Sequence, residues 1–220
     1  MKTAKIFLSL AVCAVLGIFL AAAQAAPKAA KSNAKQTKGE AKMEQTDKTK
    51  SKILIAYFSR TGEQYGVGVI SKGNTRIAAE IIASKTGGTL FEIKPKDDKY
   101  PKAYKDLIKY ARDEMKNNAR PELARDVENF ADYDTVFIGY PVWWGDKPMP
   151  VYTFIEKHDF RDKTIIPFAT HEGSGFCGTQ GMAKTGAIIK EGLGIYGHVA
   201  QNERTQAEKE IAEWLNGLGF

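Results

Sequence analysis

Hydroxyl, amide and glycine residues gather in two short segments that could hold an anion. Residues 59–62 have the sequence SRTG, and residues 73–75 have the sequence GNT at the start of a predicted helix. Neutral donors beside the free N–H groups of a helix N-terminus suit a phosphate. The chain contains no GxxxxGK[ST] pattern, so the lysine of a triphosphate-binding loop is missing. The two segments predict a site for a phosphate monoester, and an ordinary turn with a helix cap is the alternative.

Short apolar runs alternate with helical stretches from Lys52 onward and must position these segments. Four runs are rich in β-branched and aromatic residues and are apolar at both odd and even positions, which is typical of strands covered on both faces. They span residues 53–59, 89–93, 135–140 and 164–170, and residues 195–200 form a weaker fifth candidate. Helices are predicted over residues 77–85, 104–111, 149–157 and 179–190, and from the capping box of Thr205 and Glu208 onward.

Strands that alternate with helices in this way predict an α/β fold. The expected architecture is a doubly wound, five-stranded parallel sheet with helices on both faces. Ligands of such sheets bind beyond the carboxyl ends of the strands. The loops that follow the predicted strands are therefore the expected positions of function.

The basic excess of the chain lies outside the predicted domain. The whole chain has a net charge of +6 and a pI near 9.1, values that would ordinarily suggest a nucleic-acid partner. Residues 53–220, in contrast, hold 22 basic and 23 acidic residues. The predicted domain is nearly neutral, and we expect no nucleic-acid partner.

The first 25 residues have the pattern of an export signal. Lys2 and Lys5 precede an apolar stretch over residues 6–23, and Ala23 and Ala25 supply small residues for cleavage. Because no arginine pair precedes the apolar stretch, a Sec-type signal peptide over residues 1–25 and a periplasmic or secreted protein are predicted. An uncleaved stretch would instead anchor the protein in the membrane, facing outside the cytoplasm.

Residues 26–51 form a lysine-rich segment between this signal and the predicted domain at residues 52–220. Met43 is the only sizeable apolar side chain in the segment, so it cannot bury enough surface to fold. We expect a solvated, disordered linker, and the alternative is a basic tether to an anionic surface.

Three loops of the predicted domain together resemble the FMN-binding loops of flavodoxins. They are YFSRTG with GNT after the first predicted strand, YPVWWG after the third and THEGSG after the fourth. The resemblance extends from Lys52 to Phe220, in particular to a flavodoxin-like group whose second loop carries a PVWWG-type motif. The chain departs from the flavodoxin pattern at residues 63–73, which interrupt an otherwise continuous TGNT phosphate loop.

The resemblance implies non-covalently bound FMN. It assigns the FMN phosphate to Ser59, Thr61, Gly62, Asn74 and Thr75. It assigns the isoalloxazine ring to Pro141, Val142, Trp143, Trp144 and Gly145, and its other edge to Thr170, His171, Glu172, Gly173, Ser174 and Gly175. Tryptophan rings can cover a flavin, and glycine amides can approach its N1, C2 oxygen and N5. The two tryptophans should point apart, and core packing or a partner-binding patch is their alternative role.

Other motifs give weaker signals. Residues 173–178 match GxGxxG, but they follow the wrong strand for a dinucleotide fingerprint. Cys177 could be a redox thiol or simply a small side chain, because the predicted mature chain has no second cysteine. Tyr65 could cap the flavin or lie on the surface. His158 and His198 have no further ligand at metal-binding spacing, so no metal site is predicted.

Three functions follow from the resemblance. The first is an electron carrier that exposes its flavin near Trp143 and Trp144 and exchanges electrons with a redox partner protein or a small quinone-type acceptor. The second is an FMN-dependent NAD(P)H or quinone oxidoreductase. Dedicated electron carriers often have strongly acidic faces, so the near-neutral charge of the predicted domain is compatible with this enzyme. The third is a flavodoxin-fold binding domain without flavin, since a Sec-exported chain must acquire FMN outside the cytoplasm.

Overall fold

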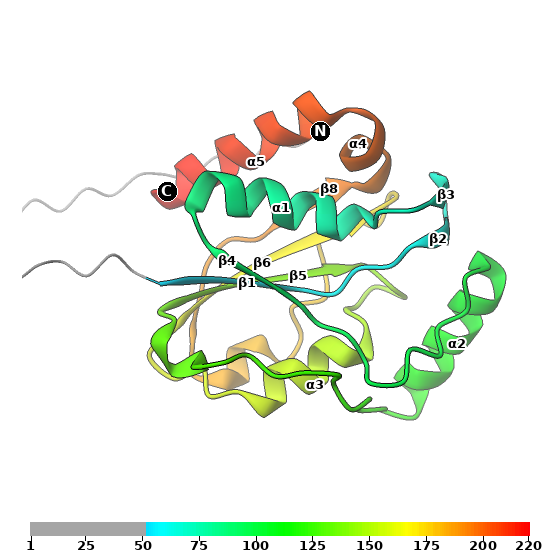
Figure 1. Cartoon of the computed structure of the whole chain (residues 1–220), viewed down its shortest axis with the longest axis horizontal. Helices are drawn as coiled ribbons and strands as arrows, with labels where there is room; N and C mark the ends of the chain where they lie inside the picture. Colours follow the sequence, from blue (N-terminus) through cyan, green and yellow to red (C-terminus); the bar gives the residue numbers. More distant parts are fainter. Residues whose placement is uncertain (1–51) are drawn as a thin grey trace, which may run out of the picture. The chain divides into compact units, whose positions relative to one another are not determined.

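The computed structural model describes residues 52–220 (Figure 1). The predicted signal peptide and the predicted lysine-rich linker lie outside the described residues. Within the described part, no helix is both long enough and apolar enough to span a bilayer.

A parallel sheet forms the centre of the domain, with strand order β4-β1-β5-β6-β7 and with β8 also paired to β6. Its strands are β1 (Ile53–Tyr57), β4 (Thr89–Glu92), β5 (Thr135–Pro141), β6 (Thr164–His171), β7 (Ile188–Ile189) and β8 (Leu193–Tyr196). β7 and β8 pair with successive parts of β6, so the two together fill the place of a fifth strand. The predicted α/β fold is confirmed.

Helices cover both faces of this sheet (Figure 1). α1 (Asn74–Thr86), α4 (Gly197–Asn202) and α5 (Arg204–Leu218) lie on one face, and α3 (Met149–Lys157) lies on the other. Ile55 belongs to the core cluster under α1 and α5, whereas its neighbours Leu54 and Ala56 belong to the cluster that contains α3 residues. Burial on both faces explains why the strands are apolar at odd and even positions alike.

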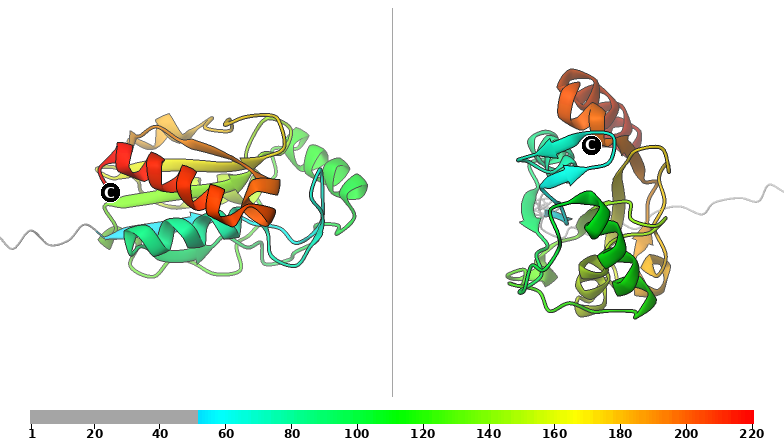
Figure 2. Two further views of the ribbon diagram at one scale, coloured as in Figure 1. Left: turned by 90° about the horizontal axis from the view of Figure 1, so that it is seen from above. Right: turned by 90° about the vertical axis from the view of Figure 1, so that its right-hand side faces the viewer.

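α2 (Tyr104–Lys116) stands beyond the carboxyl ends of the strands. Figure 2 shows it there from two directions, in front of the sheet edge in the right-hand view. The predicted helix over residues 104–111 is confirmed and extends one turn further. A short 3-10 helix, η1 (Phe130–Asp132), precedes β5.

Three local predictions near the C-terminus were wrong. Instead of a helix over residues 179–190, the chain forms the 3-10 helix η2 (Met182–Thr185) and then β7, because Gly181 and Gly186 both have positive φ and end the short turn on either side. In place of the strand predicted over residues 195–200, β8 spans Leu193–Tyr196 and α4 begins at Gly197. The predicted capping box does not form, since Glu208 instead accepts a hydrogen bond from Arg204.

The segment that interrupts the phosphate loop forms an antiparallel β-hairpin of β2 (Gly62–Gln64) and β3 (Gly68–Ile70). The hairpin is attached to the start of α2, because the Glu63 N–H donates to the carbonyl of Lys102 over 2.9 Å. The Glu63 carboxylate in turn accepts the Tyr104 N–H over 2.8 Å. This carboxylate therefore caps the N-terminus of α2 from a distant part of the chain.

Candidate functional site

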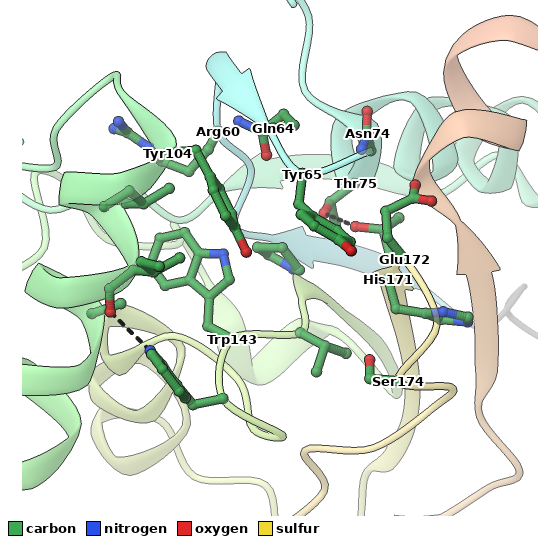
Figure 3. A pocket seen from close by; sticks show the side chains of 17 residues that line it. Arg60, Gln64, Tyr65, Asn74, Thr75, Tyr104, Trp143, His171, Glu172 and Ser174 are labelled. Atoms are coloured by element: carbon green, nitrogen blue, oxygen red, sulfur yellow. Dashed lines mark hydrogen bonds between the residues drawn. The ribbon is translucent and has the colours of Figure 1, made fainter. Parts of the chain in front are cut away.

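A pocket of about 280 Å³ opens at the carboxyl ends of β1, β5 and β6 (Figure 3). It lies where the strand order reverses, because the chain places β4 on one side of β1 and β5 on the other. Ten of the residues assigned to FMN by sequence line it: Asn74, Thr75, Pro141, Val142, Trp143, Trp144, Thr170, His171, Glu172 and Ser174. The pocket lining does not include Ser59, Thr61, Gly62, Gly145, Gly173 or Gly175.

The N-terminus of α1 forms the polar end of the pocket. The Ser59 hydroxyl accepts the Arg76 N–H over 3.0 Å, and a Cβ at Gly73 would stand only 2.2 Å from that hydroxyl. Glycine at position 73 thus lets the first loop pack directly on the helix start. The N–H groups of Asn74 and Thr75 lie in the first turn, where a helix provides no acceptor for them. They are free to bind an anion.

Two buried threonine hydroxyls fix this helix to the sheet. Thr75 Oγ1 and Thr170 Oγ1 are 2.7 Å apart, and both residues are buried. Each hydroxyl can donate one hydrogen bond and accept others. The hydrogen bond between the two uses the proton of one hydroxyl, so the proton of the other and the remaining lone pairs are available to a ligand. This contact holds the anion-binding turn of α1 against the end of β6.

The two tryptophans form opposite sides of a tight turn. Trp144 and Gly145 both have positive φ, of 55° and 77°, and Trp143 exchanges two backbone hydrogen bonds with Asp146. These features are those of a type I′ turn. Trp143 packs edge-on against Phe58, with ring centroids 5.5 Å apart. The two rings have different partners, because Trp143 packs on Phe58 whereas Trp144 is held on α2, and both side chains line the pocket.

Trp144 joins the second loop to α2. Its indole N–H donates to the carbonyl of Ile108 over 2.9 Å, and the Arg112 guanidinium lies 4.8 Å from the centre of its ring. The side chain is nevertheless 49% exposed. It therefore lies at the mouth of the pocket, where a bound aromatic ring would meet solvent.

The third loop positions a carboxylate beside the polar end. Glu172 accepts hydrogen bonds from the backbone N–H and from Nδ1 of His198, each over 2.7 Å. A Cβ at Gly197 would stand 2.2 Å from the Asn74 amide and 2.7 Å from the Glu172 carboxylate, so only glycine allows this packing. The hydrogen bonds from His198 therefore hold the Glu172 carboxylate close to Asn74 at the start of α1.

His171 interacts with the protein more than with the pocket. Its Nδ1 accepts the Gly173 N–H over 3.2 Å, and its ring centroid is 4.5 Å from that of Tyr196. Burial lowers the pKa of His171 below its ordinary value. The side chain is therefore expected to be neutral at pH 7, with Nδ1 as the acceptor.

Sequence reasoning missed the wall that the hairpin and α2 contribute. The additional lining residues are Arg60, Gln64, Tyr65, Tyr104, Leu107, Ile108 and Ala111. The helical spacing of residues 104–111 had indicated an amphipathic helix, but spacing does not tell a pocket from a core. Tyr65 is 62% exposed, and its ring lies 5.7 Å from that of Tyr104 (Figure 3). Tyr65 therefore lies at the pocket mouth. The sequence alone did not decide whether this side chain caps the flavin or lies on the surface.

Two buried donors in this wall have no acceptor within the described part of the chain, namely Arg60 Nε and Gln64 Nε2. The terminal nitrogens of Arg60 are paired, with Asp98 and with the carbonyls of Tyr100 and Pro101. A buried donor without an acceptor costs about 1–3 kcal/mol. A ligand with carbonyl or ring-nitrogen acceptors would remove this cost, so the pocket suits a polar aromatic ligand.

The weaker sequence motifs gain no site from the structure. No α-helix follows directly on residues 173–178, and Gly173, Gly175 and Gly178 all have positive φ in an irregular loop, so the dinucleotide fingerprint is not formed. Burial raises the pKa of the Cys177 thiol, which disfavours a reactive thiolate. Among residues 52–220 no cluster of three or more metal-ligating side chains occurs.

The fold and the pocket define a doubly wound α/β protein with its ligand site at the reversal of strand order. Residues 52–217 match the family model described as Flavodoxin, and the chain belongs to the flavodoxin family. FMN is the cofactor of this family.

Solved structures agree with the family. A Bacteroides eggerthii protein classed as a flavoprotein is 33% identical, with 77% of this chain and 99% of that chain covered and a TM-score of 0.60. A similar protein from Bacteroides uniformis is 32% identical, with 74% and 98% covered and a TM-score of 0.59. A Lactobacillus acidophilus flavoprotein in complex with FMN shares the fold at 23% identity, with 70% and 99% covered and a TM-score of 0.53. No curated protein matches the chain.

The residues of the pocket fit FMN. The first turn of α1 provides free N–H groups for the phosphate, and Trp143 with the tyrosines provides aromatic surfaces for the ring. The unpaired donors of Arg60 and Gln64 match the carbonyl and nitrogen acceptors of an isoalloxazine.

Proposed function

We propose that this protein is an exported flavodoxin that binds one FMN non-covalently and transfers electrons. The observation that carries the proposal is the pocket at the strand reversal. It combines an anion-binding helix start, aromatic walls and two buried donors that need acceptors. FMN would supply one-electron and two-electron redox chemistry in this position.

The protein's own groups would bind and orient the cofactor. The N–H groups of Asn74 and Thr75 would hold the phosphate, and Arg60 and Gln64 would donate to the ring. Trp143, packed on Phe58, would exclude water from one side. Trp144 is half exposed, so the adjoining edge of the cofactor would remain open to a redox partner.

The test of cofactor binding is the visible absorption spectrum of residues 26–220 after incubation with FMN and, as the control, with riboflavin. We expect flavin bands that persist through gel filtration with FMN but not with riboflavin, because only FMN carries the phosphate. A protein that stays colourless with both would contradict the proposal and leave a binding domain without flavin.

The second candidate is an FMN-dependent NAD(P)H or quinone oxidoreductase. It is favoured by the near-neutral charge of residues 53–220, which gives the domain no overall acidic charge to attract basic partners. Steady-state turnover of the FMN-loaded protein with NAD(P)H and a quinone would select the enzyme. Reduction by dithionite without such turnover would select the carrier.

Export is the part of the proposal that concerns residues 1–51. The predicted Sec-type signal implies a mature protein outside the cytoplasm. We expect N-terminal sequencing of the exported protein to begin at Ala26. A chain that keeps Met1 and pellets with membranes would show that the apolar stretch serves as an anchor.

A further inference from the structure

Cations line one side of α2 at the mouth of the pocket. Lys105, Lys109, Arg112 and Lys116 are spaced by four, three and four residues, so they form one stripe on the helix, which we call the basic stripe. All four side chains are exposed. Within the described residues none of them makes an ion pair, although other exposed cations do, such as Lys72 with Glu80 and Lys96 with Glu122.

The basic stripe borders the pocket rather than the rest of the domain. The side of α2 that faces the pocket carries Leu107 and Ala111, and the stripe lies on the side next to Trp144, whose ring is covered by Arg112. The acidic residues Asp106 and Asp113 adjoin the stripe, because each is three or four residues from Lys109, but they lie on its far side from Trp144. Figure 2 shows α2 beyond the ends of the sheet strands, and the four cations of the stripe are exposed there.

Unpaired cations beside an electron-transfer site attract an anionic partner and orient it. α2 has no exposed large hydrophobic side chain among those described, so its outer surface resembles the charged rim of a protein interface more than a surface that enters a bilayer. Trp144, half exposed beside the stripe, supplies an aromatic contact of the kind enriched at such interfaces.

We propose that the basic stripe docks an acidic one-electron carrier protein with its redox centre next to Trp144. This inference rests on the proposed function. A reduced carrier would give one electron to the oxidised cofactor and would itself become oxidised, and two such encounters would complete the two-electron reduction, with the protons taken from water. The stripe forms no bond in this step and acts by steering and orientation.

The test measures electron transfer from a reduced plant-type [2Fe–2S] ferredoxin, an acidic carrier, to the FMN-loaded protein by stopped flow. We expect the second-order rate constant to fall as salt is raised. The variant K105E/K109E/K116E should lower it by about tenfold or more at low ionic strength, because steering of this kind changes association rates by about 10–1,000-fold. The rate constant of the neutral variant K105Q/K109Q/K116Q should lie between those of the wild type and of K105E/K109E/K116E.

The matched control is K184E/K190E/K209E, which makes the same change of net charge at exposed lysines outside the pocket lining. Equal losses in the control and in the α2 variant would overturn the docking site, as would a rate that does not respond to salt. Basic cytochrome c, as an acceptor from the reduced protein, should show the opposite response to K105E/K109E/K116E.

Carbodiimide cross-linking to the same ferredoxin separates failure of this inference from failure of FMN binding. Cross-links from Lys105, Lys109 or Lys116 in protein without FMN would support the docking site even if no flavin binds. Cross-links only elsewhere would overturn it. Sedimentation with phosphatidylglycerol vesicles that is lost in K105E/K109E/K116E, with an unchanged ferredoxin rate, would overturn it in favour of a membrane surface.

Discussion

Single buried groups in and near the pocket determine how it is built and what it can bind. Lys147 is fully buried, and its ammonium donates to the carbonyls of Gly178 and Gln180 and lies near the Asp146 carboxylate. It joins the end of the second loop to the continuation of the third. Burial lowers the pKa of Lys147 to about 8, so the group carries a cost that depends on pH.

The free energy of unfolding should depend on pH because of the lowered pKa of Lys147. Because the pKa of Lys147 is lower in the folded chain, the unfolded chain binds more protons between pH 8 and 10.5, and the stability contribution of Lys147 rises with pH there. The measurement is the free energy of unfolding of the wild type minus that of K147M, from denaturant unfolding at pH 7 and at pH 10. This difference should be about 2 kcal/mol larger at pH 10. A constant difference would mean that Asp146 and the carbonyls keep the ammonium charged in the fold.

Gln64 offers a second test at the scale of a residue. Its Nε2 is a buried donor with no acceptor in the part of the chain that the structure describes. The Gln64→Leu variant should therefore raise the FMN dissociation constant about 5-fold to 30-fold while leaving the apoprotein as stable or more stable. Fluorescence titration and denaturant unfolding measure the two effects. Gln206→Leu, at an exposed position on α5, is the control. Unchanged FMN affinity together with lower stability would contradict a role in binding.

At the scale of elements, the wall opposite β6 depends on how the hairpin is attached to α2. Gln64 and Tyr65 come from the hairpin, and Tyr104 comes from α2. The Glu63 carboxylate connects the two elements by capping the helix. The pocket is therefore assembled from elements that local sequence alone does not bring together.

Removing this cap should loosen the wall. The Glu63→Ala variant is expected to lose about 1 kcal/mol of stability, to weaken FMN binding and to lose hydrogen-exchange protection at the Tyr104 amide, because that N–H would have no acceptor. Exchange measured by NMR gives the local readout. Glu213→Ala, at an exposed position on α5, should change none of these. A Tyr104 amide that remains protected would show that Glu63 is not its acceptor in solution.

At the scale of the whole molecule, charge is distributed unevenly although residues 53–220 are nearly neutral. The acids and bases form ion pairs over much of the surface, as with Lys96 and Glu122, but among residues 52–220 the basic stripe beside the pocket has no ion-pair partner. A near-zero total charge therefore hides a local excess of positive charge along one side of α2. The sequence count alone had suggested only that an overall acidic docking face was missing.

The fold followed from local patterns because both faces of the sheet are buried. Runs such as residues 53–57 are apolar at every position, and that pattern is typical of a covered parallel strand. Prediction failed at residues 179–190 and 195–200, where β7, β8 and α4 are short. There the tertiary pairing with β6 and the positive-φ glycines outweighed local propensity.

The sequence by itself determined the α/β fold, the flavodoxin resemblance and the loops that surround the pocket, because each depends on residues close together in the chain. Only the tertiary structure decided that the hairpin and α2 complete the pocket and that the Thr75 hydroxyl forms a hydrogen bond with the Thr170 hydroxyl. It also decided that, within residues 52–220, Arg60 Nε and Gln64 Nε2 have no acceptor. These contacts join residues far apart in sequence. Their geometry is determined by packing, which local residue patterns do not specify.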